Sequence, residues 1–422
     1  MADVVIGLQW GDEAKGRFVD YIAKDYDLIC RFQGGANAGH TIVVNNTKLV
    51  LHLLPSGVIR PEKKNLITAG VLIDPDVFKQ EVEEISSLTG PLNGRLFVDE
   101  RATIVLPFHK EEDALEEESR GGIGSTKRGI AYAYRDLYQR IAIRVGDLFH
   151  EKTLTRKVKD ITDFNNQIIA ARFGHPPFDY KKILEDLKEF AQFIKPFTTD
   201  GFEFIHKMER EGKRILFEGA QGSLLDIIYG TYPYVTSSHT ISSGALVFSG
   251  LPPQKIERVY GVFKAYTTRV GKGPFPTEIK DKEGELIREK GQEFGATTGR
   301  PRRCGWLDLV ILKYSVLLNG VTNLVMTKLD VLSGLNPVKV ATKYKKDGKI
   351  TELPPPMSED LEAVEPVYEE FAGFELSLKE ERYEELHKNA RKYIEFIEKQ
   401  LGLEINYISV GPEREKLIRK TY

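Results

Sequence analysis

Short apolar runs alternate with stretches of helical spacing along most of the chain. Residues 4–8 form an apolar run, residues 12–25 repeat apolar positions at helical spacing, and residues 28–32 are apolar again. This order predicts a strand, a helix and a second strand, the opening of a parallel α/β unit. Further buried strands are predicted at 65–73, 95–98, 214–217, 259–265, 324–328 and 405–410. The whole pattern predicts an α/β fold with a large, mostly parallel central sheet flanked by helices.

Several segments are predicted to elaborate this sheet. Residues 41–54 alternate apolar and polar positions about Asn45 and Asn46, which predicts a hairpin that serves as a lid or an edge. Residues 151–197 and 376–401 carry Lys, Glu, Leu and Ile at helical spacing and are expected to be covering helices. No internal repeat or long low-complexity linker is visible, although Pro354 to Pro356 marks a stiff surface connection. We therefore expect one domain, 1–422, with hairpin and helical elaborations.

Charge and cysteine content restrict the class of protein. Sixty basic and sixty-two acidic side chains give a formal net charge of -2, which argues against a nucleic-acid-binding or membrane-surface protein. Any phosphate site must be local. Cys30 and Cys304 are too few for a disulfide framework, and no secretory signal pattern follows Met1. No apolar run approaches the roughly 20 residues of a membrane span. The expectation is a cytoplasmic enzyme without a membrane partner.

A glycine-bearing loop joins the first predicted strand to the first predicted helix. It reads Gly-Leu-Gln-Trp-Gly-Asp-Glu-Ala-Lys-Gly over 7–16, with Lys15 in the first helical turn. Backbone N–H groups at a helix start, together with a lysine, bind phosphate, as in a P-loop-NTPase-like nucleotide site. However, Ala14 and Gly16 flank Lys15, whereas a Walker A sequence requires Gly-Lys-Ser/Thr. The alternative is that Asp12 merely caps the helix, and this loop alone does not decide between the two.

A second glycine-rich loop, 31–41, follows the second strand and is expected to face the first loop across the carboxyl edge of the sheet. His40 would then oppose Asp12. A carboxylate beside an imidazole supplies an acid and a base, and the carboxylate also suits magnesium. The alternative is an ordinary loop histidine.

Two further strings suggest ligand contacts. Thr327-Lys-Leu-Asp330 follows an apolar run and resembles the guanine-reading sequence of GTP-binding proteins, because the Asp330 carboxylate can accept from both N1–H and the amine of guanine. A chance match is the alternative for so short a motif. Residues 295–303 combine glycines with three arginines, which suits carboxylate or phosphate recognition better than a solvated basic turn. Residues 217–226 and 230–238 follow a strand, are rich in small polar groups, and predict a binding wall.

Taken together, these loops resemble the adenylosuccinate synthetase family from Val5 to Gly411. The resemblance is carried by Glu-Gly-Ala-Gln-Gly at 218–222, Tyr-Pro-Tyr-Val-Thr-Ser-Ser at 232–238, Lys-Ala-Tyr-Thr-Thr-Arg-Val at 264–270, Gly-Pro-Phe-Pro-Thr at 273–277 and Glu-Phe-Gly-Ala-Thr-Thr-Gly-Arg at 293–300. It implies a C–N ligase of AMP biosynthesis, which joins L-aspartate to IMP through 6-phosphoryl-IMP. The products are adenylosuccinate, GDP and phosphate.

The resemblance also implies roles for individual residues. Asp12 corresponds to the base, His40 to the acid, and Lys15 and Gln221 complete the catalytic set. One Mg²⁺ per subunit would be held by Asp12 and the Gly39 carbonyl. Aspartate is expected at Ala296, Thr297, Thr298, Gly299, Arg300, Pro301 and Arg302. IMP is expected at Asp12, Glu13, Ala14, Lys15, Asn37, Ala38, Gly39, His40, Thr126, Gln221, Thr236 and Arg300, and at Arg140 reaching across a homodimer. GTP is expected at Gly11, Asp12, Glu13, Ala14, Lys15, Gly16, Arg17, Gly39, His40, Thr41, Arg302, Lys328, Leu329, Asp330, Ser409, Val410 and Gly411.

Some positions depart from the family pattern. Ala14 stands where glycine is usual; a positive φ there would strain it by roughly 1 kcal/mol, but we expect it inside the first helical turn. Ala131 and Tyr132 replace a Gly-Pro pair on the path to Arg140, and Cys304, where threonine is common, is expected to be a small buried residue. A GTP-binding switch without ligase chemistry, and a ligase for a different carboxylate or nucleotide, are the competing hypotheses.

Overall fold

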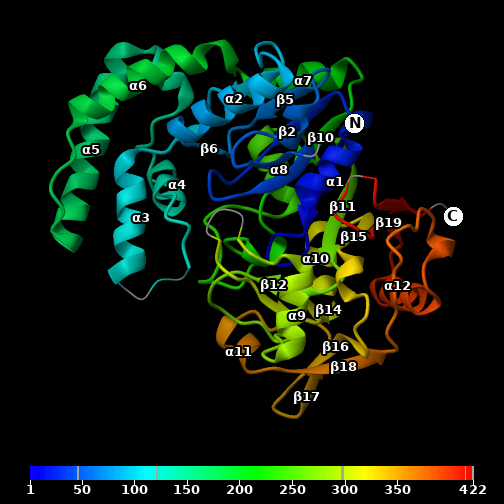
Figure 1. The fold of residues 1–422 in the computed structure, drawn as a ribbon. Helices are drawn as coiled ribbons and strands as arrows, with labels where there is room; N and C mark the ends of the chain where they lie inside the picture. Colours follow the sequence, from blue (N-terminus) through cyan, green and yellow to red (C-terminus); the bar gives the residue numbers. More distant parts are fainter. Residues whose placement is uncertain (45–46, 120–121, 123, 296–298, 414, 421–422) are drawn as a thin grey trace.

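The computed structural model describes residues 1–44, 47–119, 122, 124–295, 299–413 and 415–420. Within these residues, a 10-stranded sheet forms the centre of the molecule, in the order β20-β19-β15-β11-β1-β10-β2-β5-β7-β9 (Figure 1). All neighbouring strands pair in parallel except the β19–β20 pair at one edge. The predicted fold class is confirmed. The strands of this sheet are β1 (Ala2–Gly7), β2 (Leu28–Arg31), β5 (Lys64–Ile67), β7 (Leu96–Asp99), β9 (Thr198–Thr199), β10 (Ile215–Glu218), β11 (Ile256–Lys264), β15 (Asn323–Thr327), β19 (Ile405–Ser409) and β20 (Leu417–Arg419).

Helices pack against both faces of the sheet, which explains the unbroken apolar character of its middle strands. Every residue of β1 is buried, as expected for a parallel strand covered on two sides. Val4 and Ile6 enter one core, whereas Val5 enters the opposite core with Phe18 and Val19. The helices are α1 (Lys15–Ile22), α2 (Pro75–Thr89), α3 (Pro107–Ser119), α4 (Ile130–Tyr138), α5 (Glu151–Phe173), α6 (Tyr180–Ile194), α7 (Gly201–Arg210), α8 (Ser242–Ser249), α9 (Lys282–Gly291), α10 (Leu309–Asn319), α11 (Ser358–Glu362) and α12 (Lys388–Leu401).

Two elaborations flank the central sheet. Helices α3 to α6 lie together at one side, on the left of Figure 1. Helices α3, α5 and α6 share a separate core with the β5–β7 edge of the sheet, and α4 packs in a smaller cluster with Leu72 and Val105. A small second sheet lies at the bottom of the view, where β16 (Val338–Lys346) pairs with β14 (Leu307–Asp308), β17 (Lys349–Thr351) and β18 (Glu365–Phe371). The remaining strands form two-stranded pairs: β3 (His40–Val44) with β4 (Thr47–Leu51), β6 (Leu72–Ile73) with β8 (Thr103–Ile104), and β12 (Thr267–Arg269) with β13 (Arg303–Gly305).

Several predicted boundaries are wrong. The strand expected at 65–73 is interrupted after Ile67, because the chain turns there and the Val71 N–H donates to the Thr68 carbonyl at 3.2 Å. By contrast, the helices expected in 151–197 are present, as two helices separated at Gly174, which adopts φ 67°. In 376–401, the α-helix begins only at Lys388. Leu378 has a positive φ of 61°, and the separate 3-10 turn Tyr383–Glu385 ends at Leu386 in an extended conformation, so helical geometry is interrupted twice before it. The hairpin forms, and among the residues that the structure describes β3 and β4 pair only with each other. Asn45 and Asn46 lie outside those residues.

Candidate active site

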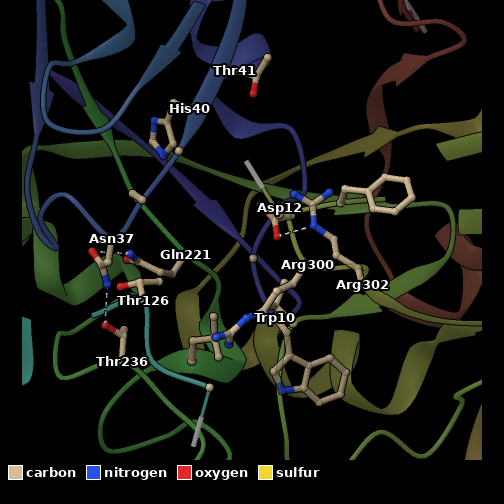
Figure 2. A pocket seen from close by; sticks show the side chains of 18 of the residues that line it. Trp10, Asp12, Asn37, His40, Thr41, Thr126, Gln221, Thr236, Arg300 and Arg302 are labelled. Carbon is tan, nitrogen blue, oxygen red and sulfur yellow. Dashed lines mark hydrogen bonds and ion pairs between the residues drawn. The ribbon is translucent and has the colours of Figure 1, made fainter. Parts of the chain in front are cut away.

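The carboxyl ends of the central strands surround a cavity of about 980 Å³. Loops after β1, β2, β10 and β15 all contribute to its wall, which is the usual place for a ligand in an open parallel sheet. Most of the predicted site residues line it: Gly11, Asp12, Ala14, Lys15, Gly16, Arg17, Asn37, Ala38, Gly39, His40, Thr41, Thr126, Gln221, Thr236, Arg300, Arg302, Lys328, Asp330 and Gly411. Segments far apart in the sequence therefore meet as predicted (Figure 2).

The first loop is held in shape by one of its own side chains. Glu13 is fully buried, and its Oε1 accepts hydrogen bonds from the backbone N–H groups of Gln9 (3.1 Å) and Gly11 (2.9 Å). Lys15 Nζ donates to the other carboxylate oxygen at 2.6 Å. Glu13 was predicted to contact GTP and IMP, but its carboxylate points into the loop and stabilises the loop's curvature. The sequence pattern carries no sign of this inward turn.

Ala14 does not lie within the first helical turn as expected. The helix begins at Lys15, and Ala14 precedes it in the left-handed region, with φ 64° and ψ 33°. An L-residue with a β-carbon is strained in this conformation by about 1 to 2 kcal/mol, whereas glycine adopts it freely. The alanine at this position therefore costs stability, and the family's usual glycine has a conformational reason.

Replacing Ala14 with glycine is expected to stabilise the protein by about 0.5 to 1 kcal/mol, because relief of strain outweighs the added entropy of the unfolded chain. For a chain of this size the melting temperature should rise by about 1 °C in a calorimetric scan. Ala23, at the other end of α1, has φ -55° and serves as the matched control. Ala23→Gly should lower the melting temperature, and a lowered value for Ala14→Gly as well would contradict the assignment of strain.

His40 is oriented by a buried carboxylate. Its Nδ1 contacts Glu218 Oε1, and Glu218 also accepts hydrogen bonds from the Ser56 backbone N–H (2.7 Å) and hydroxyl (2.5 Å). Burial lowers the pKa of His40, and the Glu218 carboxylate offsets part of that shift. Burial alone would raise the pKa of Glu218, but His40 and Ser56 bring it below its usual value. The ring therefore keeps a proton on Nδ1, and its buried Nε2, which has no hydrogen-bond partner within the described residues, remains for a ligand.

Asp12 lies in the same cavity, in a left-handed conformation with φ 60°. Its carboxylate is 31% exposed and forms an ion pair with Arg302, Oδ2 to Nε, at 2.9 Å (Figure 2). Arg302 lies in the loop that precedes β13. The expected base, Asp12, is therefore in direct contact with the loop expected to bind aspartate. The sequence predicted both residues but not this pairing.

A polar cluster forms the wall next to His40. Gln221 Nε2 donates to Asn37 Oδ1 at 3.2 Å, and Asn37 Nδ2 donates to Thr236 Oγ1 at 3.4 Å (Figure 2). Gln33 Nε2 fixes the other end of the Gln221 amide, donating to Oε1 at 2.9 Å. Amide and hydroxyl groups of this kind can both donate to and accept from the edges of a purine ring. Thr126 lines the cavity beside them.

Two of the predicted guanine residues, Lys328 and Asp330, line the same cavity. Asp330 is largely buried, its Oδ1 has no hydrogen-bond partner among the described residues, and burial raises its pKa. Lys328 directs its ammonium to the Gly291 carbonyl (2.7 Å) and to Glu293 (2.8 Å). Arg17 donates to the Ser409 hydroxyl at 2.7 Å. An unpartnered carboxylate acceptor at this position suits the N1–H and amine of guanine.

Not every predicted residue faces the cavity. Leu329 and Val410 are buried in the hydrophobic core, so only their backbone groups could meet a nucleotide. Arg140 lies beyond the end of α4, exposed and outside the cavity of its own chain. Gly299 and Pro301 are also absent from the cavity wall, and Ala296, Thr297 and Thr298 lie outside the described residues. Cys304 is buried, as expected.

The residues fit a hard cation that takes most of its ligands from substrate oxygens. Within the described ranges, no cluster of three or more His, Cys, Asp or Glu side chains could hold a metal by itself. The Asp12 carboxylate and Gly39 both line the cavity, and oxygen donors of this kind suit Mg²⁺ when phosphates complete its shell. In the same described part of the chain, every helix is too short or too polar to span a membrane.

The chain is similar to known proteins of one family over nearly its whole length. The family model for adenylosuccinate synthetase matches residues 4–418. The adenylosuccinate synthetase of Caldanaerobacter subterraneus subsp. tengcongensis is 46% identical over 419 residues, 98% of each chain, and that of Thermoanaerobacter sp. is 47% identical over 418 residues, again 98% of each. The fully ligated adenylosuccinate synthetase from Plasmodium falciparum superposes with a TM-score of 0.95 at 38% identity, covering 99% of both chains.

Proposed function

Since the chain belongs to the adenylosuccinate synthetase family, we propose that its cavity performs the ligation in two steps through 6-phosphoryl-IMP. The family establishes the overall reaction: a C–N bond forms between L-aspartate and IMP at the expense of GTP, and adenylosuccinate is the product. The observation that carries the two-step proposal is the presence of Asp12 and the His40–Glu218 pair in one cavity, next to a cluster that can bind a purine edge.

In the first step, Asp12 takes the proton from N1 of IMP, and O6 attacks the γ-phosphorus of GTP. GDP leaves with the electrons of the broken bond. His40 donates a hydrogen bond from Nε2 to the phosphoryl group in transfer, and Lys15 neutralises phosphate charge. In the second step, the amine of aspartate attacks C6, and O6 leaves as part of inorganic phosphate. Phosphate is a far better leaving group than hydroxide, which is why GTP is consumed.

The same proposal assigns the ligands to parts of the cavity. The purine of IMP lies against Asn37, Gln221 and Thr236, and the guanine of GTP donates from its N1–H and its amine to the Asp330 carboxylate. The carboxylates of aspartate meet Arg300 and Arg302. Mg²⁺ would be held by Asp12, the Gly39 carbonyl and phosphate oxygens, and would neutralise charge on the transferring phosphoryl group.

We also propose a homodimer in which Arg140 serves the IMP phosphate of the partner subunit. Arg140 is exposed, adopts φ 66° after α4, and does not line the cavity of its own chain. An exposed cation at this position is accessible to a neighbouring copy. The single-domain organisation belongs to the same proposal, supported by a central sheet whose strands extend from Ala2 to Arg419. The cytoplasmic location stays a prediction.

The fate of one oxygen atom tests the intermediate. With IMP labelled by ¹⁸O at O6, the two-step reaction should place the label in the released phosphate, detected by mass spectrometry. Direct displacement by aspartate would instead release the label as water and leave the phosphate unlabelled. A reaction without aspartate, which should release no labelled phosphate in turnover amounts, is the control.

A further inference from the structure

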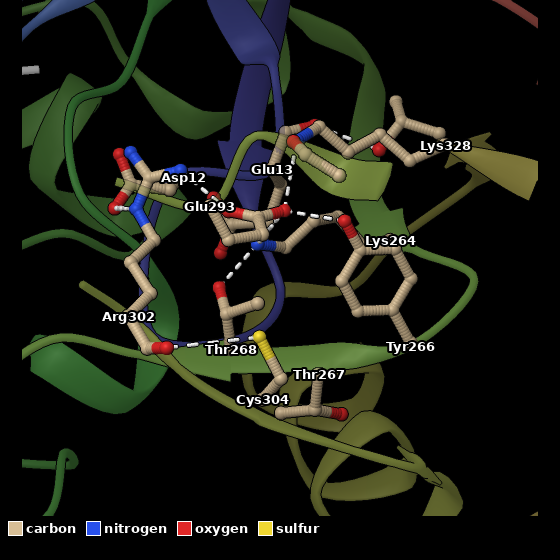
Figure 3. Close-up of polar contacts among 12 residues, drawn as sticks. Asp12, Glu13, Lys264, Tyr266, Thr267, Thr268, Glu293, Arg302, Cys304 and Lys328 are labelled. Atoms are coloured by element: carbon tan, nitrogen blue, oxygen red, sulfur yellow. Dashed lines mark hydrogen bonds and ion pairs between the residues drawn. The ribbon is translucent and has the colours of Figure 1, made fainter. Parts of the chain in front are cut away.

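A buried carboxylate behind the cavity wall joins parts of the site that the mechanism uses separately. Glu293 follows α9, precedes the loop that carries Arg300 and Arg302, and has 0% solvent exposure. Figure 3 shows that side chains from β11, from the loop after β15 and from the loop before β13 converge on it. Because Glu293 does not line the cavity, no substrate contact accounts for it.

The two oxygens of Glu293 bind different partners. Oε1 accepts from Lys328 Nζ at 2.8 Å and from Lys264 Nζ at 3.2 Å, and it also accepts from the Tyr266 hydroxyl. Oε2 accepts from Arg302 Nη1 at 2.5 Å. The Arg302 backbone N–H donates to the Glu293 carbonyl at 2.9 Å, so the start and the end of the loop are tied together.

These contacts form a continuous chain of charges across the site. Lys328 belongs to the guanine motif, Glu293 connects it to Arg302, and Arg302 pairs with Asp12 at 2.9 Å (Figure 3). The guanidinium of Arg302 is therefore held from both sides, by a carboxylate that faces substrate and by one that does not. If bound ligands draw Asp12 to other partners, Glu293 still fixes the position of Arg302.

The Glu293 carboxylate and the Lys264 ammonium form a buried group of charges. Burial alone would raise the pKa of Glu293, but Lys264, Lys328 and Arg302 hold it far below its usual value, so the carboxylate is ionised. Lys264 is itself completely buried, and burial lowers its pKa to about 8. Removing these charges from water costs free energy, and apolar side chains of the same volume often stabilise a protein as much. The buried charges are therefore weak evidence that the group contributes to the stability of the fold. Its more specific effect is to fix the geometry of the two cations at the cavity wall.

We propose that Glu293 is a positioning residue that holds Lys328 and Arg302 in place together, and so sets the affinities for GTP and for aspartate. The inference rests on the proposed roles of Arg302 at the aspartate carboxylates and of Lys328 at the guanine. A side chain freed from Glu293 must be ordered again each time its ligand binds, and that ordering weakens binding. In the proposed arrangement IMP contacts neither Lys328 nor Arg302, so its binding does not depend directly on Glu293.

Glu293→Gln is the direct test, because it keeps the shape and removes the charge. Loss of charge-assisted hydrogen bonds of this kind is expected to raise the KM for aspartate about tenfold and the KM for GTP severalfold. The KM for IMP should stay within about twofold, and kcat should change less than the KM for aspartate. A purely structural role would lower the melting temperature and the amount of active enzyme without this selective pattern in KM.

A second variant guards against misfolding, since Glu293→Gln leaves the Lys264 ammonium buried without its carboxylate. The double variant Lys264→Met/Glu293→Gln removes the pair and should show the same selective rise in KM. Glu112, another fully buried glutamate, binds Arg135 (2.8 Å) and Arg172 (3.1 Å), so Glu112→Gln is the matched control and should leave both KM values unchanged.

The outcomes distinguish the positioning role of Glu293 from the proposed role of Arg302 at aspartate. If both Glu293 variants show KM values for aspartate and GTP no higher than those of Glu112→Gln, Glu293 is not a positioning residue. Arg302→Lys, measured alongside, keeps the charge but loses the planar two-pronged contact and should raise the KM for aspartate. An unchanged value there would overturn the proposed role of Arg302, whereas a raised value together with unaffected Glu293 variants would overturn the positioning role alone.

Discussion

Replacing Asp12 with asparagine is expected to lower kcat by about a thousandfold, while GTP binding stays measurable. Asparagine keeps the shape of the side chain but cannot accept the N1 proton of IMP, and general acid–base catalysis contributes roughly 10² to 10⁴ in rate. The Mg²⁺ ion of the proposed mechanism would also lose a carboxylate oxygen donor. Steady-state turnover with IMP, aspartate and GTP, followed by the change in purine absorbance, measures kcat, and calorimetric titration measures GTP binding.

The control for Asp12→Asn is Asp74→Asn. Asp74 is a buried aspartate at the N-terminus of α2, where it accepts the Asp76 N–H, and it lies outside the cavity. Asparagine caps a helix as well as aspartate does, so Asp74→Asn removes only the ion pair with Lys110 (3.1 Å) and should leave kcat nearly unchanged. Turnover by Asp12→Asn above about a tenth of the parent rate would be too fast for an enzyme that has lost its base, and would remove Asp12 from that role.

The sheet could be predicted because parallel strands covered on both faces are recognisable as apolar runs. β1 and β10 are buried along their whole length, and each was expected within two residues of its observed bounds. The second sheet was not expected, because β18 reads Glu-Pro-Val-Tyr-Glu-Glu-Phe and none of its residues is fully buried. Its place is determined by pairing with β16, a contact that a local pattern does not contain.

The cavity could be predicted in outline for a similar reason. Loops that follow parallel strands meet at one edge of the sheet. The glycine-rich loops after the strands predicted at 4–8, 28–32 and 214–217 were therefore expected to lie close together. The residues that orient the site were missed. Glu218 and Glu293 both stand in strings that carried the family resemblance, but their partners are distant in sequence: His40 is 178 positions from Glu218, and Lys328 is 35 positions from Glu293.

Local conformation was the hardest part to anticipate. The start of α1 depends on Glu13 turning into the loop, where it binds two backbone N–H groups and Lys15. That turn places Ala14 at a positive φ outside the helix. Helical spacing continues through residues 12–25 and gives no sign of it, because periodicity reports which face is apolar and not where the first hydrogen-bonded turn begins.

Replacing His40 with asparagine is expected to lower kcat by about 10² to 10³, because a donor aimed at the transferring phosphoryl group is lost. Whether Nε2 can donate depends on the protonation state of the His40 ring. Its Nδ1 faces the ionised Glu218, so Nε2 carries a hydrogen only when the ring is a cation. Burial lowers the pKa of His40 in the free chain. The phosphates of GTP then raise that pKa, and binding of GTP should take up a proton at this ring above neutral pH.

The sign of the pH dependence follows from that uptake. The GTP complex holds the His40 proton more tightly than the free chain, so GTP affinity should fall as pH rises above the pKa of the free imidazole, by up to about tenfold per pH unit. Titrations in buffers of different ionisation enthalpy measure the uptake, and the uptake lost in His40→Asn is the share of this ring. Glu218→Gln removes the anion that raises the pKa of His40, so the ring of this variant takes up a proton less readily. The variant should therefore bind GTP more weakly than the parent, and its kcat should be about tenfold lower. Equal proton uptake by the parent and His40→Asn would show that His40 stays neutral and cannot donate from Nε2.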